Sequence, residues 1–541
     1  MTTATRGEAE KKHRLSPGSL WAAMGAYAIL IGVLAAKHEM WRDEVRAFSV
    51  ATTASSWGAL LADLHHEGHP IVWYAILRAG YSITHSTLVL PLAALTIGMV
   101  TAYLILRYAP FPVWLRLLAL FGPFMGYELT VVSRNYGIGV LMMIIACIAY
   151  KVRSERPLYL GIALALLANT SVHGAAASLL LAAFWLTDVF RDDRRKRTLA
   201  PLSILALLLV VAGAAFAFWT AHPSSDMSWG FSISSLDYGK VAGAIFSDPG
   251  KSLLGFHDAN IVAAGELPWG KIGLDPSIAS RILVDAALAW LFWSLRGSWR
   301  AIVAIALACI GFAIVFRNIY TGGLRHEGIL LFLIFSICWM TVTDSTVGSA
   351  VPARDIALGL LPLFALQTAA LPMVAFRVLK YPESDSKAFA QLVDANPKYQ
   401  NAILMAEPDY MGEAFHYYLR NPVFMARQGD FEPRVYFDKG VRRRQDMTLG
   451  QFVDVADSLS CARKVPVLIA IGYKDFAAKR AGQGTLAYKP SRFLWSESDW
   501  IRLHTMQPGN VPIATLPLAA TDESYQIFEV SPITNGTCEL K

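Results

Sequence analysis

Charged residues are scarce in this chain. Only 16% of its 541 residues are charged and 55% are hydrophobic, whereas an average soluble protein is about 25% charged. So little charge cannot cover the surface of a soluble protein of this length, and it also excludes a disordered chain or a nucleic-acid scaffold. The composition therefore predicts an integral membrane protein. The formal net charge of +7 fits this class, because basic residues concentrate in cytoplasmic loops.

Cysteines are also few, and no internal repeat or low-complexity tract is present. Three of the five cysteines, Cys147, Cys309 and Cys338, lie in apolar segments. The other two, Cys461 and Cys538, lie in the last third of the chain, where charges become frequent. If that part is exported, these two can form a disulfide, and two free thiols are the alternative.

Apolar segments follow one another through the first 377 residues. A membrane span needs about 20 apolar residues, or somewhat fewer or more with tilt. Residues 70–84 are apolar but short and carry Arg78, so we expect an interfacial helix there. Eleven other segments are candidate transmembrane helices: 18–36, 87–107, 112–129, 135–150, 157–171, 174–190, 199–220, 280–296, 300–316, 327–343 and 355–377.

The basic clusters predict the orientation of these spans. With eleven spans and a cytoplasmic N-terminus, every compact basic cluster of the membrane half, including RDDRRKR at 191–197, lies on the cytoplasmic side. An odd number of spans then places the C-terminal part outside the cytoplasm. We therefore expect a multi-pass protein of the bacterial inner (cytoplasmic) membrane with a periplasmic or extracellular C-terminal domain.

A change of composition near Lys380 marks the expected domain boundary. Residues 1–377 are expected to form the transmembrane domain, with a first outer loop over 37–86, and residues 378–541 a soluble α/β domain. In the second domain we expect a parallel core, and no phosphate loop, nucleophile elbow or paired metal ligands are recognisable, so an accessory role in acceptor binding is expected. The expected strands are 401–407, 422–428 and 465–473, and the expected helices are 409–420 and 448–460.

Unusual polar residues gather in the turns that this topology places outside. Ionisable groups at membrane ends are functional candidates, since a carboxylate there can accept a proton while arginines hold an oxyanion as a bond breaks. The candidates are Asp43, Glu44, Glu67, His69, Arg134, Tyr136, His173, Arg325 and His326.

Each of these residues can also have a purely structural role. An Asp-Glu pair at a helix start can be a cap, and Arg42 and Arg46 can simply neutralise it. Arg134 can reach lipid headgroups. His65 and His69 have the spacing of metal ligands on a helix, but the glycine and proline beside them should break a helix there, so no histidine metal site is expected. The convergence of several turns on one face favours a functional site.

Three segments resemble the GT-C glycosyltransferases, in particular the protein O-mannosyltransferase and lipid A aminoarabinose transferase group. Asp43-Glu44 in the first outer loop resembles the acidic motif of these enzymes, EGHPIVWYAIL at 67–77 resembles their short interfacial helix, and SRNYG at 133–137 resembles their Arg-x-Tyr segment. The resemblance covers most of residues 15–200 and is architectural beyond them. The aminoarabinose transferases carry a lysine before the proline, where this chain has His69.

The resemblance implies an inverting transfer of a sugar from a polyprenyl-phosphate carrier to an acceptor on the extracytoplasmic side. Asp43 would be the general base, and Glu44 would position the acceptor or support Asp43. Arg134 and Arg325, with His69 or His326, would bind the carrier phosphate. Tyr136, His173 and Glu67 are candidates for further contacts with donor or acceptor.

The resemblance also implies the partners. These are the polyprenyl-phosphate sugar, an envelope glycan, lipid or protein as acceptor, and membrane lipids, with no nucleic acid. A divalent metal is left open but not favoured, and no other cofactor is expected. The loop at 221–279 is a lid over a lipid groove or an interfacial loop. The alternative function is a transporter or flippase of lipid-linked sugar, but transporters typically show repeated halves and mid-membrane polar residues, which this sequence does not show.

Overall fold

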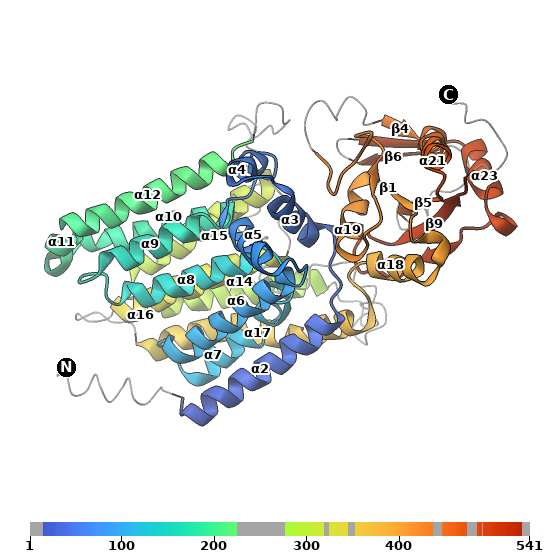
Figure 1. Cartoon of the computed structure of the whole chain (residues 1–541). Helices are drawn as coiled ribbons and strands as arrows, with labels where there is room; N and C mark the ends of the chain where they lie inside the picture. Colours follow the sequence, from blue (N-terminus) through green and yellow to red (C-terminus); the bar gives the residue numbers. More distant parts are fainter. Residues whose placement is uncertain are drawn as a thin grey trace.

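A bundle of long helices and a mixed α/β region lie side by side in this protein (Figure 1). The structure is a computed structural model, and every statement below concerns the residues that it describes. These are residues 15–223, 276–318, 324–344, 352–436, 446–472, 484–488 and 491–532.

Each of the eleven predicted transmembrane segments contains a helix of the bundle. Seven helices are long and apolar enough to cross a membrane, and three further apolar helices are shorter. The predicted fold class, a multi-helix membrane protein with a C-terminal α/β region, is confirmed. The eleven helices are α2 (Pro17–Lys37), α6 (Val89–Tyr108), α7 (Val113–Leu120), α8 (Tyr136–Tyr150), α9 (Pro157–Ala168), α10 (Val172–Leu186), α12 (Pro201–Ala221), α14 (Pro276–Ser294), α15 (Trp299–Asn318), α16 (Leu324–Asp344) and α17 (Ala353–Lys380).

The predicted span at 112–129 is not one continuous helix. α7 has only eight residues, and a separate π-helical turn, η1 (Phe124–Glu128), follows it. Pro123 explains the break, because it has no N–H to donate to the carbonyl four residues earlier. The interruption brings η1 and the turn behind it to the end of the bundle where α3 lies.

The first outer loop folds into three short helices, α3 (Arg42–Thr53), α4 (Trp57–Leu64) and α5 (Val72–Thr84). α5 is the helix predicted at 70–84. Its Arg78 donates hydrogen bonds to the carbonyls of Ala51 and Ala54 at 3.0 and 2.7 Å, and so caps the C-terminal end of α3. A cation at that end is favoured by the exposed carbonyls and the helix dipole. The cap fixes α3, the helix that carries Asp43, against α5.

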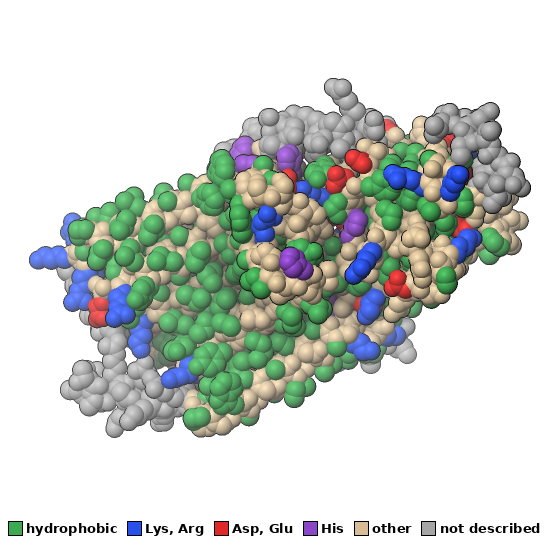
Figure 2. Space-filling model, viewed as in Figure 1, with side chains coloured by type: hydrophobic (Ala, Val, Ile, Leu, Met, Phe, Trp, Pro, Cys, Tyr) green, Lys and Arg blue, Asp and Glu red, His purple; other side chains and the backbone are tan. Residues whose placement is uncertain are grey.

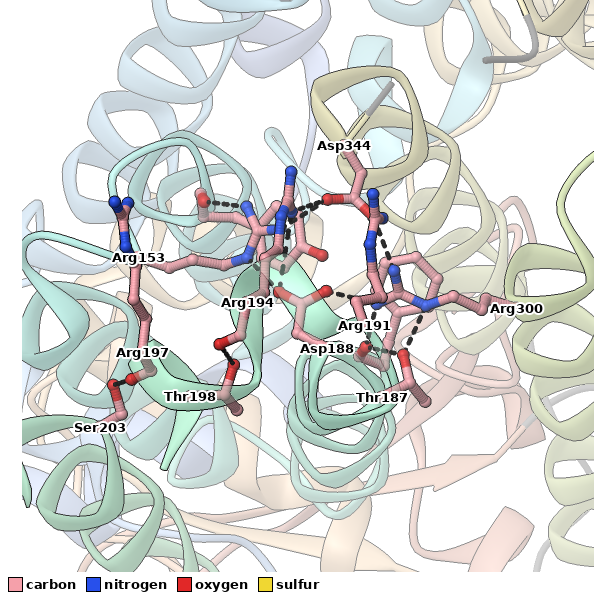
Figure 3. A network of polar contacts seen from close by, with 12 residues as sticks. Arg153, Thr187, Asp188, Arg191, Arg194, Arg197, Thr198, Ser203, Arg300 and Asp344 are labelled. Atoms are coloured by element: carbon pink, nitrogen blue, oxygen red, sulfur yellow. Dashed lines mark hydrogen bonds and ion pairs between the residues drawn. The ribbon is translucent and has the colours of Figure 1, made fainter. Parts of the chain in front are cut away.

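On the face that Figure 2 shows, hydrophobic side chains cover most of the bundle, and Lys and Arg side chains gather at the end away from the C-terminal region, near η2 (Thr187–Phe190) and α11 (Asp192–Thr198). There a network of arginines closes around two carboxylates (Figure 3). Asp344 accepts hydrogen bonds of 2.6 Å from each of Arg153, Arg191 and Arg300. Asp188 accepts from Arg153 at 2.8 Å. The basic loops that the sequence assigns to one side of the membrane therefore meet at one end of the bundle, and which compartment this end faces stays a prediction.

A four-stranded mixed sheet forms the centre of the C-terminal region. Its strand order is β1-β5-β9-β8, with β1 and β5 parallel and the other two pairs antiparallel. A second sheet has the order β4-β7-β6 and packs with α21. The strands are β1 (Ile403–Glu407), β2 (Phe424–Met425), β3 (Asp430–Phe431), β4 (Asp446–Thr448), β5 (Val467–Gly472), β6 (Gly484–Tyr488), β7 (Ser491–Trp495), β8 (Ala514–Leu516) and β9 (Tyr525–Val530), and the helices are α18 (Ser386–Ala395), α19 (Phe415–Tyr418), α21 (Leu449–Arg463) and α23 (Glu497–Thr505).

In the central sheet the predicted parallel core is right for β1 and β5 only, and β4 and β7 of the second sheet are also parallel. β9 comes from the last described stretch of the chain and runs antiparallel beside β5, which the local pattern of β5 could not reveal. The strand predicted at 422–428 shortens to β2, and the helix predicted at 409–420 is a 3-10 turn, η7 (Asp409–Ala414), followed by α19. α17 continues to Lys380, so the predicted boundary at 377/378 falls in its last turn, and the division into two domains stays a prediction.

The cysteines divide as their positions suggest. Cys147, Cys309 and Cys338 are buried free thiols in the bundle. Cys461 on α21 is disulfide-bonded, and Cys538 lies outside the described residues. The predicted lid at 221–279 also lies almost entirely outside them.

Candidate active site

Asp43 and Glu44 occupy the first turn of α3, where carboxylates are favoured by the helix dipole. Adjacent residues on a helix point about 100° apart, so the two side chains face different surroundings. The Glu44 side chain is completely buried, whereas the Asp43 side chain is 39% exposed and reaches a cavity. The two members of the predicted acidic motif therefore have different environments.

The Glu44 carboxylate is hydrogen-bonded to residues before and after it in the chain. Its carboxylate lies 2.8 Å from Nε2 of His38 and accepts the backbone N–H of Ser133 at 2.5 Å. The other ring nitrogen of His38 lies 2.8 Å from the hydroxyl of Tyr127. Although burial of its ring opposes the charge, the neighbouring Glu44 carboxylate raises the pKa of His38. Glu44 thus ties α3 to the turn that carries Arg134, a placement that suits support of the Asp43 environment and not contact with an acceptor.

Two arginines from distant segments converge on the Asp43 carboxylate. An Nη1 atom of Arg134 lies 3.9 Å from Oδ2 of Asp43, and Nη1 of Arg325 lies 3.8 Å from the same oxygen. Arg134 also donates a hydrogen bond to the backbone carbonyl of Asp43. Arg325 lies over the ring of Trp41, with 5.2 Å between Cζ and the ring centroid, and 3.9 Å from a carboxylate oxygen of Glu128. The structure therefore brings the predicted base and the two predicted phosphate ligands together.

These arginines keep Asp43 ionised. Enclosure by the protein opposes its charge, but Arg134 and Arg325 outweigh that effect and lower the pKa of Asp43 below its usual value. At neutral pH, Asp43 is a carboxylate between two guanidinium groups, with no direct side-chain hydrogen bond between them at these distances.

A cavity of about 210 Å³ opens beside Asp43. Four of the predicted site residues line it, and they come from α3, from the turn before α5 and from the turn before α8. Its walls also include residues that the sequence did not single out. For two of them, Trp73 and Tyr74, the available signal was an aromatic pair in the EGHPIVWYAIL segment. The lining residues are Asp43, Arg46, Ala47, His66, Glu67, His69, Trp73, Tyr74, Arg134 and Asn135.

Glu67 is already paired within this cavity. Both of its carboxylate oxygens accept from Arg46, at 2.9 and 2.7 Å, and the Arg46 guanidinium also donates to Glu413 at 2.6 Å. Arg46 lies one helical turn after Asp43, which is the spacing that places two residues on one face of a helix. In the structural alternative, Arg46 would neutralise the Asp-Glu pair. Its hydrogen-bonded partners are Glu67 and Glu413, although its charge also contributes to the lowered pKa of Asp43.

His69 lies on the cavity wall as an uncharged ring. Burial, together with the neighbouring positive charge of Arg134, lowers the pKa of His69 to about 3. The predicted contact of His69 with the carrier phosphate would therefore be a hydrogen bond and not an ion pair at neutral pH.

Tyr136, His173 and His326 form a separate buried cluster between the helices. The Tyr136 hydroxyl lies 2.6 Å from Nε2 of His326, and the rings of His173 and His326 have centroids 4.8 Å apart. Phe312 packs against His173 with ring centroids 5.4 Å apart. None of these three predicted residues lines the cavity. Of the other six predicted residues, four line it, while Glu44 and Arg325 lie beside Asp43 without lining it.

The C-terminal region binds the N-terminal end of α3, next to the cavity, through an ion pair and hydrogen bonds. Arg42 donates to both carboxylate oxygens of Asp522, at 2.6 and 3.0 Å, and the backbone N–H of Arg42 donates to Glu523 at 2.9 Å. The Tyr418 hydroxyl donates to the carbonyl of Met40 at 3.0 Å. Arg42 and Asp522 are 480 positions apart in the chain, so no local sequence signal could have paired them. Arg42, which in the structural alternative only neutralises the Asp-Glu pair, thus joins α3 to the α/β region, and its charge also contributes to the lowered pKa of Asp43.

No metal-binding group emerges from the parts of the chain that the structure describes. Within them, no three residues among His, Cys, Asp and Glu are placed to hold an ion. The cavity carboxylates are instead accompanied by arginines.

Comparison with known proteins yields one distant likeness. No protein-family model matches the chain, and no curated protein matches it by sequence. Among solved structures, it resembles the crystal structure of ArnT from Cupriavidus metallidurans bound to undecaprenyl phosphate, with a TM-score of 0.44 and 12% sequence identity over 88% of this chain and 98% of that one. ArnT is a GT-C lipid A aminoarabinose transferase, a member of the group that the sequence resembles. At this level of similarity, substrate and mechanism have to be argued from the site itself.

Proposed function

We propose that this protein is an inverting glycosyltransferase that moves a sugar from a polyprenyl-phosphate carrier to an acceptor hydroxyl on the outer side of the membrane. One observation carries the proposal. The Asp43 carboxylate stands at the edge of a polar cavity with two arginines, Arg134 and Arg325, less than 4 Å from the same oxygen.

The three residues supply what the reaction needs. The acceptor oxygen attacks the anomeric carbon and forms the new C–O bond, while the bond from that carbon to the phosphate oxygen breaks. The hydroxyl proton goes to Asp43, and the electron pair of the broken bond stays with the polyprenyl phosphate. Arg134 and Arg325 stabilise the charge that develops on this leaving group, since the guanidinium fork matches phosphate oxygens. Phosphate leaves readily, so no general acid is required.

The same arginines would change the basicity of Asp43 during the cycle. In the empty site they hold its pKa below the usual value. When they bind the donor phosphate, its negative charge offsets theirs at the carboxylate, and the proton affinity of Asp43 rises. The base would thus become effective once the donor is bound.

The membrane location of the cavity follows from the predicted topology. With the N-terminus in the cytoplasm, Asp43 and the α/β region lie on the extracytoplasmic side of the bacterial inner membrane. The isoprenoid chain would lie against the apolar bundle, and the acceptor would be an envelope glycan, lipid or protein that reaches the cavity between α3 and the α/β region. No divalent metal is needed for these steps.

Transfer by the purified protein in proteoliposomes tests the proposal. The donors are polyprenyl-phosphate sugars with a labelled sugar, and the acceptors are lipid and glycan fractions of the source envelope. Asp43→Asn should lower transfer by about 10²- to 10⁴-fold while the protein still folds, because the variant cannot accept the proton. Asp63→Asn is the matched control, since Asp63 lies in the same loop, pairs with Arg434 at 2.7 Å and does not line the cavity.

Two results would contradict the proposal. Full transfer by Asp43→Asn would remove Asp43 from the chemistry. Movement of the intact donor across the vesicle membrane without sugar transfer would favour a flippase.

A further inference from the structure

We infer that the cavity beside Asp43 selects a sugar that presents hydroxyl oxygens and no ammonium group, and that Trp73 is a specificity-determining residue. The inference rests on the proposed function and names the substrate class of the same site. It follows from counting which polar atoms of the cavity are already engaged and which are open to a ligand.

The carboxylates of the cavity are engaged. Glu67 uses both oxygens for Arg46, at 2.9 and 2.7 Å. Asp43 faces Arg134 at 3.9 Å and Arg325 at 3.8 Å. An ammonium group on the sugar would have to displace the Arg46 guanidinium group to reach Glu67, and next to Asp43 it would face the guanidinium groups of Arg134 and Arg325.

The arginines around the cavity also disfavour a cation. Among the lining residues, Asp43 and Glu67 are balanced by Arg46 and Arg134. Outside the wall, Glu413 lies 2.6 Å from Arg46 and Glu128 lies 3.9 Å from Arg325, so the neighbourhood has no surplus of positive charge. An ammonium group next to Asp43 would nevertheless lie close to the guanidinium groups of Arg134 and Arg325, and like charges at close range repel.

The open polar atoms of the cavity are mainly donors. Nε1 of Trp73 and Nε of Arg134 are buried and have no hydrogen-bond partner among the described residues. Both atoms carry a hydrogen and neither can accept. Trp73 is only 1% exposed, so water outside the protein does not satisfy its N–H. A buried donor without a partner is unfavourable, and a ligand oxygen placed in the cavity would relieve it.

His69 adds a third open atom. Its Nδ1 is buried and also lacks a partner among the described residues. A neutral imidazole nitrogen can donate or accept, which matches a sugar hydroxyl, a group with the same property. The lysine of the aminoarabinose transferases at this position could only donate, so the departure at His69 changes what the wall offers to the sugar.

The test compares two donors that differ in one group. They share the polyprenyl phosphate, and one carries arabinose while the other carries 4-amino-4-deoxyarabinose. Transfer is measured with the wild-type protein, and equilibrium binding with the Asp43→Asn variant, which does not turn over. We expect at least about a tenfold preference for the arabinose donor in both measurements, since a site built of hydrogen-bond donors rejects a cationic analogue.

The outcomes separate this inference from the proposed function. Equal binding of the two donors, or tighter binding of the amino sugar, overturns the inference whether or not transfer occurs. A tenfold binding preference for arabinose without any transfer supports the inference and contradicts the transferase. If neither donor binds, the inference is overturned, whereas the proposed function is judged by transfer from polyprenyl-phosphate donors of other sugars.

Trp73→Phe tests the specificity residue, because it keeps an aromatic ring and removes only the N–H donor. We expect about tenfold weaker binding of the arabinose donor, with little change for the amino sugar, as the hydrogen bond to a hydroxyl is lost. Trp57→Phe is the control, since Trp57 is exposed on α4 and does not line the cavity. An unchanged donor preference in Trp73→Phe would contradict the role of Trp73.

Discussion

The two ends of the helical bundle use the same side chains, arginine and aspartate, in opposite ways. At the α11 end, Asp344 accepts three hydrogen bonds of 2.6 Å from separate arginines (Figure 3). At the α3 end, Asp43 has two arginines at 3.8 and 3.9 Å, and Nε of Arg134 has no partner among the described residues. The first arrangement is closed around its own charges, and the second is open to a ligand. Distance and open donor atoms separate the two roles, whereas residue type does not.

The largest expected effect concerns the arginines of the open end. Arg134→Ala or Arg325→Ala should lower sugar transfer by about 10²- to 10³-fold, because each removes a donor to the charge that develops on the phosphate. Thermal unfolding should change little. Lysine at either position should restore part of the rate, since it keeps the charge but loses the fork. A large loss of thermal stability in the alanine variants would mean that these arginines are structural, like those around Asp344 at the α11 end.

The closed end should respond in the reverse manner. Asp344→Asn leaves Arg153, Arg191 and Arg300 without their shared carboxylate, and removal of one partner from a buried ion pair costs about 3–5 kcal/mol. Unfolding in detergent measures this loss, and transfer per folded molecule should stay close to that of the wild type. Lys196→Gln is the control, as Lys196 is exposed in the same segment. Unchanged stability of Asp344→Asn would show that the network is not structural.

A smaller effect on transfer is expected at the contact between the α/β region and α3. The double change Asp522→Asn and Glu523→Gln removes the carboxylate partners of Arg42, so Asp43 should be held less accurately. We expect kcat to fall about tenfold with KM for the donor nearly unchanged, because loss of orientation affects the chemical step. Asp457→Asn breaks an ion pair with Arg502 elsewhere in the region and serves as the control. If kcat does not change, this contact does not position Asp43.

The smallest expected effect concerns pH. Burial lowers the pKa of His69 from 6.5 to about 3, so the unfolded chain binds a proton at this residue below pH 6.5 while the folded protein does not until about pH 3. The contribution of neutral His69 to stability is therefore fully present above pH 6.5 and is lost as the pH falls toward 3. His69→Asn should flatten the pH dependence of stability in that window, as measured by unfolding at pH 4 and pH 7. An identical slope in the variant would contradict the burial of a neutral ring.

Local sequence features predicted most of the elements of the fold. The eleven apolar segments each contain a helix, because burial of apolar side chains in lipid and satisfaction of backbone hydrogen bonds within a helix depend on consecutive residues. The break at Gly122-Pro123 shows the limit of that reasoning, since hydropathy alone did not weigh the missing N–H of one proline. The mixed sheet shows another limit, because the direction of β9 beside β5 depends on a connection through much of the C-terminal region.

The sequence predicted only part of the site, because it indicates which turns lie at the same end of the bundle but not which distant residues make contact. Asp43, Arg134 and Arg325 could be brought together by topology, since turns on one side of the bundle lie near one another. The pairing of Arg42 with Asp522 and that of Arg46 with Glu413 could not, because these carboxylates lie hundreds of positions away in the α/β region. The different directions of Asp43 and Glu44 follow from helix geometry, but which of them faces the cavity depends on the packing of His38 and Ser133 around Glu44.

The sequence by itself determined that this chain is a multi-pass helical membrane protein with a carboxylate and arginines in turns at one end. These properties arise from composition, apolar run length and the positions of turns, all of which act locally. Only the tertiary structure decided which arginines are closed in ion pairs and which keep donors open to a ligand. That distinction depends on contacts of 3–4 Å between distant segments, and such contacts exist only after the helices and the α/β region have packed together.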